Sequence, residues 1–155
     1  MTAEINSLNS SKNSQIGPKK RVLFVITQSE FGGAQRFFYD LLTNLGHEKY
    51  ETLLTVGTDG VINSFETKGL ARHKLKFLRR NINPLYDLRA VWELRKLIKN
   101  FQPDVLFLNS SKAGFIGSLA TVFPSKLQTK NYKLKTIYRI GGWSFNDPWP
   151  VWKKG

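Results

Sequence analysis

The sequence predicts an α/β domain in which helices cover both faces of a parallel sheet. Short, continuously apolar runs, such as 105–108 and the β-branched run 22–26, are typical of strands buried on both faces. Between these runs, apolar residues recur at helical spacing. Strand and helix alternate four times along the chain, which favours a doubly wound sheet in the order 3-2-1-4-5.

The first elements follow a polar start. Residues 1–20 are rich in Ser and Asn, so we expect a disordered tail before a domain at 21–155. Segment 22–26 predicts the first strand. Apolar residues at helical spacing over 37–45 predict the first helix, and Gly46 suits its end.

The middle of the chain repeats this cycle. Segment 52–56 predicts the second strand, 61–69 a short helix, and 74–78 a weaker third strand. The next helix has a start signal at Asn83-Pro84, and Asp87 is a second candidate cap. Its apolar face consists of Val91, Leu94, Ile98 and Phe101.

The last elements begin where Gln102-Pro103-Asp104 breaks that helix. Residues 105–108 predict the fourth strand, 113–123 an apolar helix, and 134–140 the fifth strand. A Trp-rich segment follows at 141–155, with no helix pattern to cover the last strand. We expect the chain to stop inside a larger fold, the alternative being a loop that packs aromatic residues on the sheet edge.

Composition excludes several classes of protein. Cysteine is absent and the two histidines lie far apart, so disulfides and His/Cys metal clusters are excluded, and no Asp-x-Asp motif suggests a metal. No apolar run approaches the roughly 18 residues of a membrane span, and the N-terminus lacks the apolar core of a signal peptide. We expect a cytoplasmic domain without a metal or resident cofactor.

The chain is strongly basic, with 24 Lys and Arg against 11 Asp and Glu. Ten basic residues fall between Lys68 and Lys99, interleaved with apolar residues from Leu70 to Tyr86. This amphipathic stretch predicts docking on an anionic membrane surface. A solvated basic face and a nucleic-acid interface are the alternatives. The residues expected to face the membrane are Lys74, Lys76, Arg79 and Arg80.

Candidate binding residues follow the strands, because ligands of open α/β sheets bind beyond the carboxyl ends. After the first strand, Gly32 and Gly33 precede a helix and suit a phosphate or diphosphate, or else make a tight turn. After the fourth strand, a polar cluster suits sugar hydroxyls or a phosphate, or else caps a helix. The cluster comprises Asn109, Ser110, Ser111 and Lys112.

A third candidate segment follows the fifth strand. Gly141 and Gly142 permit close approach of the backbone, and Trp143 suits stacking on a sugar or an acyl chain. Asp147 is a candidate base, with the alternative that it begins a turn before Pro148. Glu30 is the other carboxylate near the expected cleft, and we expect it to face solvent.

Taken together and in order, these segments resemble the N-terminal domain of glycosyltransferase family 4. Gly32-Gly33-Ala34-Gln35-Arg36 stands where the family often shows Gly-Gly-Ala-Glu-Arg, and the likeness extends from about Lys20 to Trp152. Further matching segments are Ile82-Asn83-Pro84, Gln102 to Val105, Ser111 to Gly114, and Gly142 to Phe145.

The resemblance implies the Rossmann-like N-terminal half of a GT-B enzyme that transfers a hexose from a nucleotide-sugar. Gly32 and Gly33 would approach the donor diphosphate, and Ser111, Lys112 and Gly142 would line the acceptor side. Such enzymes often modify lipid-linked or polysaccharide acceptors at a bacterial membrane. Gly141 and Asn109 stand where many members have His, so the usual His roles are not carried over.

The donor-binding C-terminal domain of the family has no counterpart in this sequence. We therefore expect the chain alone to be inactive and to need a fused or separate donor domain. The alternatives are a non-catalytic binding half that pairs with a separate donor domain, and a basic nucleic-acid-binding domain.

Overall fold

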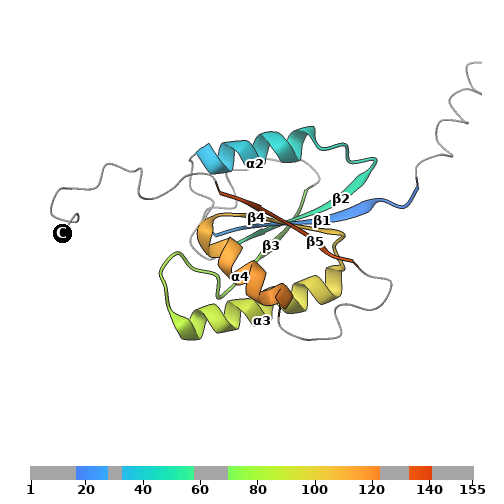
Figure 1. The fold of residues 1–155 in the computed structure, drawn as a ribbon. Helices are drawn as coiled ribbons and strands as arrows, with labels where there is room; N and C mark the ends of the chain where they lie inside the picture. The colour runs from blue at the N-terminus through green and yellow to red at the C-terminus, as the bar shows by residue number, and fades with distance from the viewer. Residues whose placement is uncertain (1–16, 28–32, 58–69, 123–132, 141–155) are drawn as a thin grey trace, which may run out of the picture.

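A computed structural model describes residues 17–27, 33–57, 70–122 and 133–140 (Figure 1). Within them, five strands form one parallel sheet in the order β3-β2-β1-β4-β5, which confirms the predicted order. The helix expected at 61–69 and most of the expected polar tail lie outside the described residues. The strands are β1 (Lys20–Ile26), β2 (Tyr50–Val56), β3 (Ala71–Lys74), β4 (Val105–Asn109) and β5 (Lys135–Arg139).

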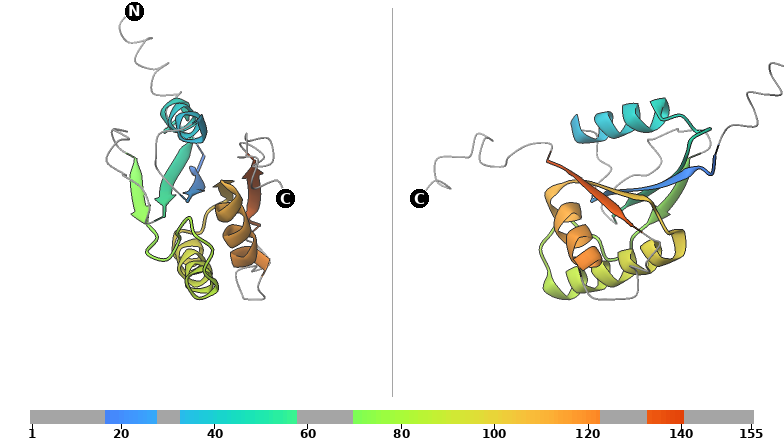
Figure 2. Two further views of the ribbon diagram at one scale, coloured as in Figure 1. Left: turned by 90° about the vertical axis from the view of Figure 1, so that its left-hand side faces the viewer. Right: turned by 45° about the vertical axis from the view of Figure 1, so that its right-hand side comes forward.

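Helices cover both faces of the sheet, as predicted. In Figure 1, α2 (Gly33–Asn44) lies above the sheet, and α3 (Pro84–Phe101) and α4 (Ser111–Val122) lie below it. The turned views in Figure 2 show the same three layers. Two apolar clusters fill the spaces between the layers.

Strand β1 supplies both clusters because successive side chains point to opposite faces. Phe24 packs against Phe38 of α2 edge to face, with ring centroids 5.5 Å apart. Leu23 and Val25, both 0% exposed, belong to the cluster on the side of α3 and α4. The continuous apolar run of β1 is thus explained by burial on both faces.

The third strand differs from the prediction. Strand β3 spans Ala71–Lys74, whereas 74–78 was expected. Leu75 adds one more hydrogen bond to β2, from its N–H to the Val56 carbonyl at 2.8 Å. The Glu93 carboxylate of α3 then accepts the N–H groups of Lys76 and Phe77, at 2.9 and 3.1 Å. The backbone therefore leaves the sheet for α3.

Helix α3 has the ends that its sequence predicts. Asn83 is the N-cap, and its Oδ1 accepts the N–H groups of Leu85 and Tyr86. Pro84 occupies the first turn, where its missing N–H costs nothing. At the other end Gln102 adopts a left-handed conformation, φ 48°, and its N–H bonds the Ile98 carbonyl.

Helix α4 packs closely on the sheet through small residues. A Cβ on Gly114 would clash with the ring of Tyr138 on β5, and one on Gly117 with the side chain of Leu108 on β4. Ala113 and Ala120 are fully buried. The apolar helix expected at 113–123 is confirmed, with its start at Ser111.

One buried hydroxyl offers a test of this packing. Thr55 on β2 is 0% exposed, and its Oγ1 has no hydrogen-bond partner among the described residues. Thr55→Val keeps the shape and removes the unsatisfied group, so we expect the free energy of unfolding to rise by about 1 kcal/mol. Urea denaturation measures this, with exposed Thr136→Val as a control that changes little. A lower midpoint for Thr55→Val would contradict the assignment.

Candidate functional site

The carboxyl ends of the strands meet through close backbone contacts. The Gly57 N–H, just after β2, donates to the Ile26 carbonyl at 3.0 Å. A Cβ on Gly57 would clash with the backbone carbonyls of Thr27 and Leu78. The absence of a side chain at Gly57 therefore allows the ends of β1 and β2 and the segment after β3 to meet.

Ser110 ties the end of β4 to the end of β1. Its Oγ lies 2.7 Å from Thr27 Oγ1, and either hydroxyl can be the donor. The same Oγ accepts the N–H of Ala113 at 3.1 Å, which makes Ser110 a cap of α4. The capping alternative thus holds for Ser110, while Ser111 begins the helix and is exposed.

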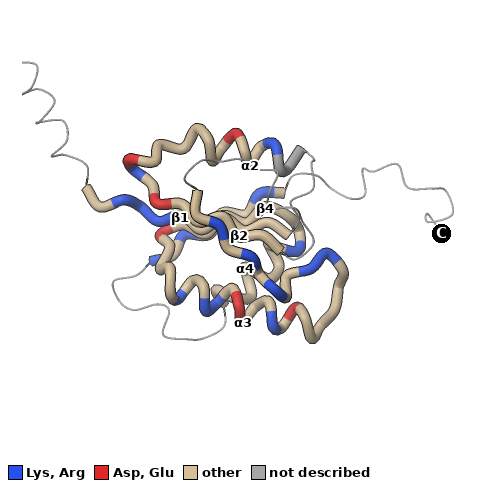
Figure 3. Tube along the Cα trace, turned by 180° about the vertical axis from the view of Figure 1, so that it is seen from behind, with Lys and Arg blue, Asp and Glu red and all other residues tan. Residues whose placement is uncertain are grey.

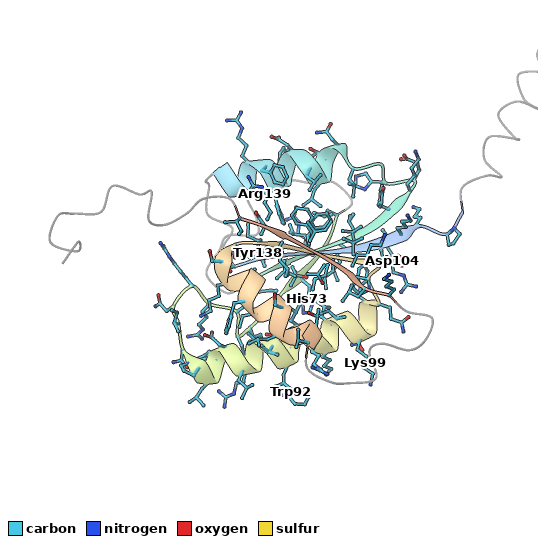
Figure 4. All side chains as sticks on the ribbon, in the orientation of Figure 1. His73, Trp92, Lys99, Asp104, Tyr138 and Arg139 are labelled. Atoms are coloured by element: carbon cyan, nitrogen blue, oxygen red, sulfur yellow. The ribbon has the colours of Figure 1, made fainter. Side chains whose placement is uncertain are left out.

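Asn109 and Arg139 are partners in the register of β4 and β5. Arg139 donates from its NH1 to Asn109 Oδ1 at 3.1 Å. Its guanidinium carbon lies 4.1 Å from the ring centroid of Phe37 on α2. Asn109 is 1% exposed, so the guanidinium is held by a buried amide and an aromatic face. Arg139 itself is labelled in Figure 4.

Lys112 joins the starts of α3 and α4. Its Nζ lies 2.7 Å from Asp87 Oδ1, and both side chains are 13% exposed. The ammonium also donates to the backbone carbonyl of Asn81. The other oxygen of Asp87 accepts the N–H of Asn83 at 3.3 Å, close to the N-cap. Lys112 was predicted to line a cleft, and its ammonium meets a carboxylate and a backbone carbonyl of the protein itself.

Several predicted site residues lie outside the described residues: Gly32, Gly141, Gly142, Trp143 and Asp147. Gly33 is the first residue of α2. The structure brings together Thr27 with Ser110, and Phe37 with Asn109 and Arg139. The spacing of these residues in the sequence predicts neither group. Only the expectation that carboxyl ends share one edge pointed toward these contacts.

The residues predicted to face a membrane, Lys74, Lys76, Arg79 and Arg80, are all exposed. The interleaved apolar residues differ from the prediction, because Leu75 and Leu78 are 0% exposed and belong to the core. The exposed apolar side chains lie further along. Ile82, Leu85, Leu88 and Trp92 are 89%, 71%, 55% and 67% exposed, and we call these four the α3 ridge.

The α3 ridge is accompanied by positive charge. Lys and Arg recur along α3 and the loop leading into it (Figure 3). Trp92 points away from the sheet below α3 (Figure 4). Of the helices that the structure describes, none combines the length and apolar character needed to cross a membrane.

The carboxyl ends of the strands lie along one edge of the sheet, which we call the carboxyl edge. The sheet order, the three layers and the polar residues at this edge define a Rossmann-like α/β domain. The sequence matches Glycosyltransferase Family 4 over residues 31–132, and the chain belongs to this family. The resemblance noted from the sequence is thereby confirmed.

Two curated relatives are the O-antigen biosynthesis glycosyltransferase WbnH and the probable O-antigen biosynthesis glycosyltransferase WbiN, both of Escherichia coli. Each is 26% identical over 81% of this chain. The chain spans 33% of the length of each relative.

Two solved structures share the fold. A putative UDP-N-acetylglucosamine 2-epimerase from Listeria monocytogenes matches with a TM-score of 0.53 and 14% identity, over 77% of this chain and 30% of that one. Another UDP-N-acetylglucosamine 2-epimerase matches with a TM-score of 0.51 and 15% identity, over 84% and 37%. At these identities the likeness concerns the fold alone.

The ion pair of Lys112 can be tested apart from any ligand. Lys112→Met leaves the largely buried Asp87 without its cation, so we expect a loss of about 1–3 kcal/mol in unfolding free energy. The double variant Asp87→Asn with Lys112→Met should lower the free energy of unfolding by less than the sum of the two single variants. Urea denaturation of the four proteins gives the coupling energy. Additive losses would show that the pair contributes nothing beyond its separate contacts.

Proposed function

We propose that residues 21–155 form the acceptor-side domain of a glycosyltransferase that transfers a hexose from a nucleotide-sugar. The observation that carries this proposal is the match to Glycosyltransferase Family 4 across residues 31–132. The two relatives named for O-antigen biosynthesis favour a polysaccharide or lipid-linked acceptor. The second domain, fused or separate, binds the nucleotide, which agrees with the 33% coverage of those relatives.

In this proposal the reaction breaks the bond between the anomeric carbon and the diphosphate and forms a bond to an acceptor oxygen. The acceptor hydroxyl loses its proton to a base, for which Asp147 is the candidate. Charge develops on the leaving diphosphate and is stabilised electrostatically. The glycine segment at 32–33 is the proposed site of that diphosphate, because α2 begins at Gly33 and the N-terminus of a helix favours an anion.

The acceptor lies along the carboxyl edge beside β4 and β5. Asn109 and Ser110 are held by contacts to Arg139 and Thr27, so they form a rigid surface against which the acceptor lies. The exposed Ser111 hydroxyl is the group of this cluster that is free to meet a sugar. Lys112 acts mainly by fixing the start of α4. Gly141, Gly142 and Trp143 complete the acceptor side in this proposal.

The transferase activity of the chain alone tests whether it is half of an enzyme. We expect the purified, folded chain to release no nucleotide from a panel of nucleotide-sugars with bacterial lipid extract as acceptor. Adding the donor-binding domain should produce acceptor-dependent release. Release by the chain alone would contradict the half-enzyme reading. No nucleotide release in the presence of an active donor domain would favour the alternative that the chain is a non-catalytic binding half.

We further propose that the domain docks at the inner face of an anionic membrane through the α3 ridge. Exposed apolar side chains at Leu85, Leu88 and Trp92 recur at helical spacing, as in helices that lie in a membrane interface. Basic residues surround them, and each cation near an anionic surface adds about 1 kcal/mol. The flanking basic residues are Lys74, Lys76, Arg79, Arg80, Arg89, Lys96 and Lys99.

Vesicle binding tests the ridge directly. Leu85→Ser combined with Trp92→Ser removes two inserted side chains, so we expect at least about tenfold weaker sedimentation with phosphatidylglycerol vesicles. Phe115→Ser is the control, because Phe115 is 59% exposed on α4 and lies outside the ridge. Equal loss in both variants would contradict the assignment.

The nucleic-acid alternative predicts a different competition. Anionic vesicles should displace a bound oligonucleotide if the membrane proposal is correct. An oligonucleotide that anionic vesicles do not displace would favour the nucleic-acid reading.

A further inference from the structure

The guanidinium of Arg139 is oriented by neutral groups at the carboxyl edge. Asn109 accepts one of its N–H groups at 3.1 Å, and the guanidinium carbon lies over the ring of Phe37, 4.1 Å from the ring centroid. Neither partner carries a charge, so neither offsets the positive charge of Arg139. Two ion pairs of the described residues, Arg21–Glu51 and Lys112–Asp87, join other residues.

The cations of those two ion pairs have carboxylate partners, and no such partner of Arg139 is found among residues 17–27, 33–57, 70–122 and 133–140. Lys112, also at the carboxyl edge, pairs with Asp87. Arg21, at the opposite end of the sheet, lies 3.8 Å from the Glu51 carboxylate and donates to the Phe101 carbonyl. Arg139 is instead fixed by a buried amide and an aromatic ring, an arrangement that orders an arginine and leaves its charge for a ligand.

The supports of Arg139 come from three separate elements. Phe37 lies on α2, Asn109 ends β4 and Arg139 ends β5. Asn109 is 1% exposed, so its amide is a rigid support. A guanidinium has five N–H donors in a planar fork that matches phosphate oxygens, and the bond to Asn109 uses one of them.

We infer that Arg139 is an anion-binding residue that takes a phosphate group of a diphosphate ester at the carboxyl edge of β4 and β5. Asn109 and Phe37 are its positioning residues. A nucleotide-sugar donor and a lipid-linked acceptor both carry this group, and that choice of ligands rests on the proposed function. The anion site itself rests on the geometry of Arg139.

Binding of inorganic pyrophosphate to the folded chain tests the site by calorimetry. We expect Arg139→Gln to weaken binding at least about tenfold, since charge-assisted hydrogen bonds are lost. Lys135→Gln is the matched control: it removes the same charge from the same strand and face, at the amino end. Phe37→Leu should give a smaller loss with an unchanged melting temperature.

Unequal losses for Arg139→Gln and Lys135→Gln support the inference. Equal losses, or no binding of pyrophosphate above that of sulfate by the folded chain, overturn it. Uridine diphosphate and geranyl diphosphate then distinguish the sources, because the ligand that depends more strongly on Arg139 identifies the donor or the acceptor. Failure of sugar transfer with Arg139-dependent pyrophosphate binding intact would reject the proposed function and leave this site standing.

Discussion

Burial of both faces of β1 is the constraint on which the rest of the molecule depends. Five successive residues from Val22 to Ile26 are buried, with alternate side chains in different clusters. Burying one such side chain contributes about 1.5–3 kcal/mol, so neither face can be left open without a large loss. Helices must therefore lie on both sides, and the parallel crossovers bring all strand ends to one edge.

That shared edge is held together mostly by neutral contacts. The Thr27–Ser110 hydroxyl pair and the absent side chain of Gly57 join the strand ends without charge. The Asp87–Lys112 pair, in contrast, fixes the helix starts and neutralises its own charges. Lys112 therefore has a structural role, because it is paired with a carboxylate. Arg139 is the residue proposed to bind an anion, because the amide and the aromatic ring that orient it do not neutralise its positive charge.

The sequence predicts the sheet order and most elements because burial on both faces leaves a local signal, as in 22–26 and 105–108. The third strand was misplaced because Leu75 and Leu78 resemble strand residues but are buried by contacts with distant parts of the chain. Glu93, which turns that backbone toward α3, lies 17 residues from Lys76. Such a contact leaves no trace in local periodicity.

The candidate site was predictable only as an edge of the sheet. The contact of Arg139 with Asn109 joins residues 30 positions apart and depends on the register of β5 against β4. Phe37 reaches the same guanidinium because α2 crosses that face of the sheet. Neither strand register nor helix placement can be predicted from composition or spacing. The sequence therefore indicates the edge of the sheet at which the site lies, and the structure identifies the residues that contact Arg139.

Helix α3 links the two proposed surfaces. One side of it is core, with Ala90, Leu94 and Ile98 fully buried, and the other side carries the α3 ridge. Its N-terminal end contacts the start of α4 through Asp87 and Lys112, so Ile82 and Leu85 lie beside the carboxyl edge of the sheet. A membrane held against the ridge would therefore lie next to the proposed acceptor side. A lipid-linked acceptor could reach that edge while its lipid stayed in the bilayer, which a ridge at the amino end of the sheet would not permit.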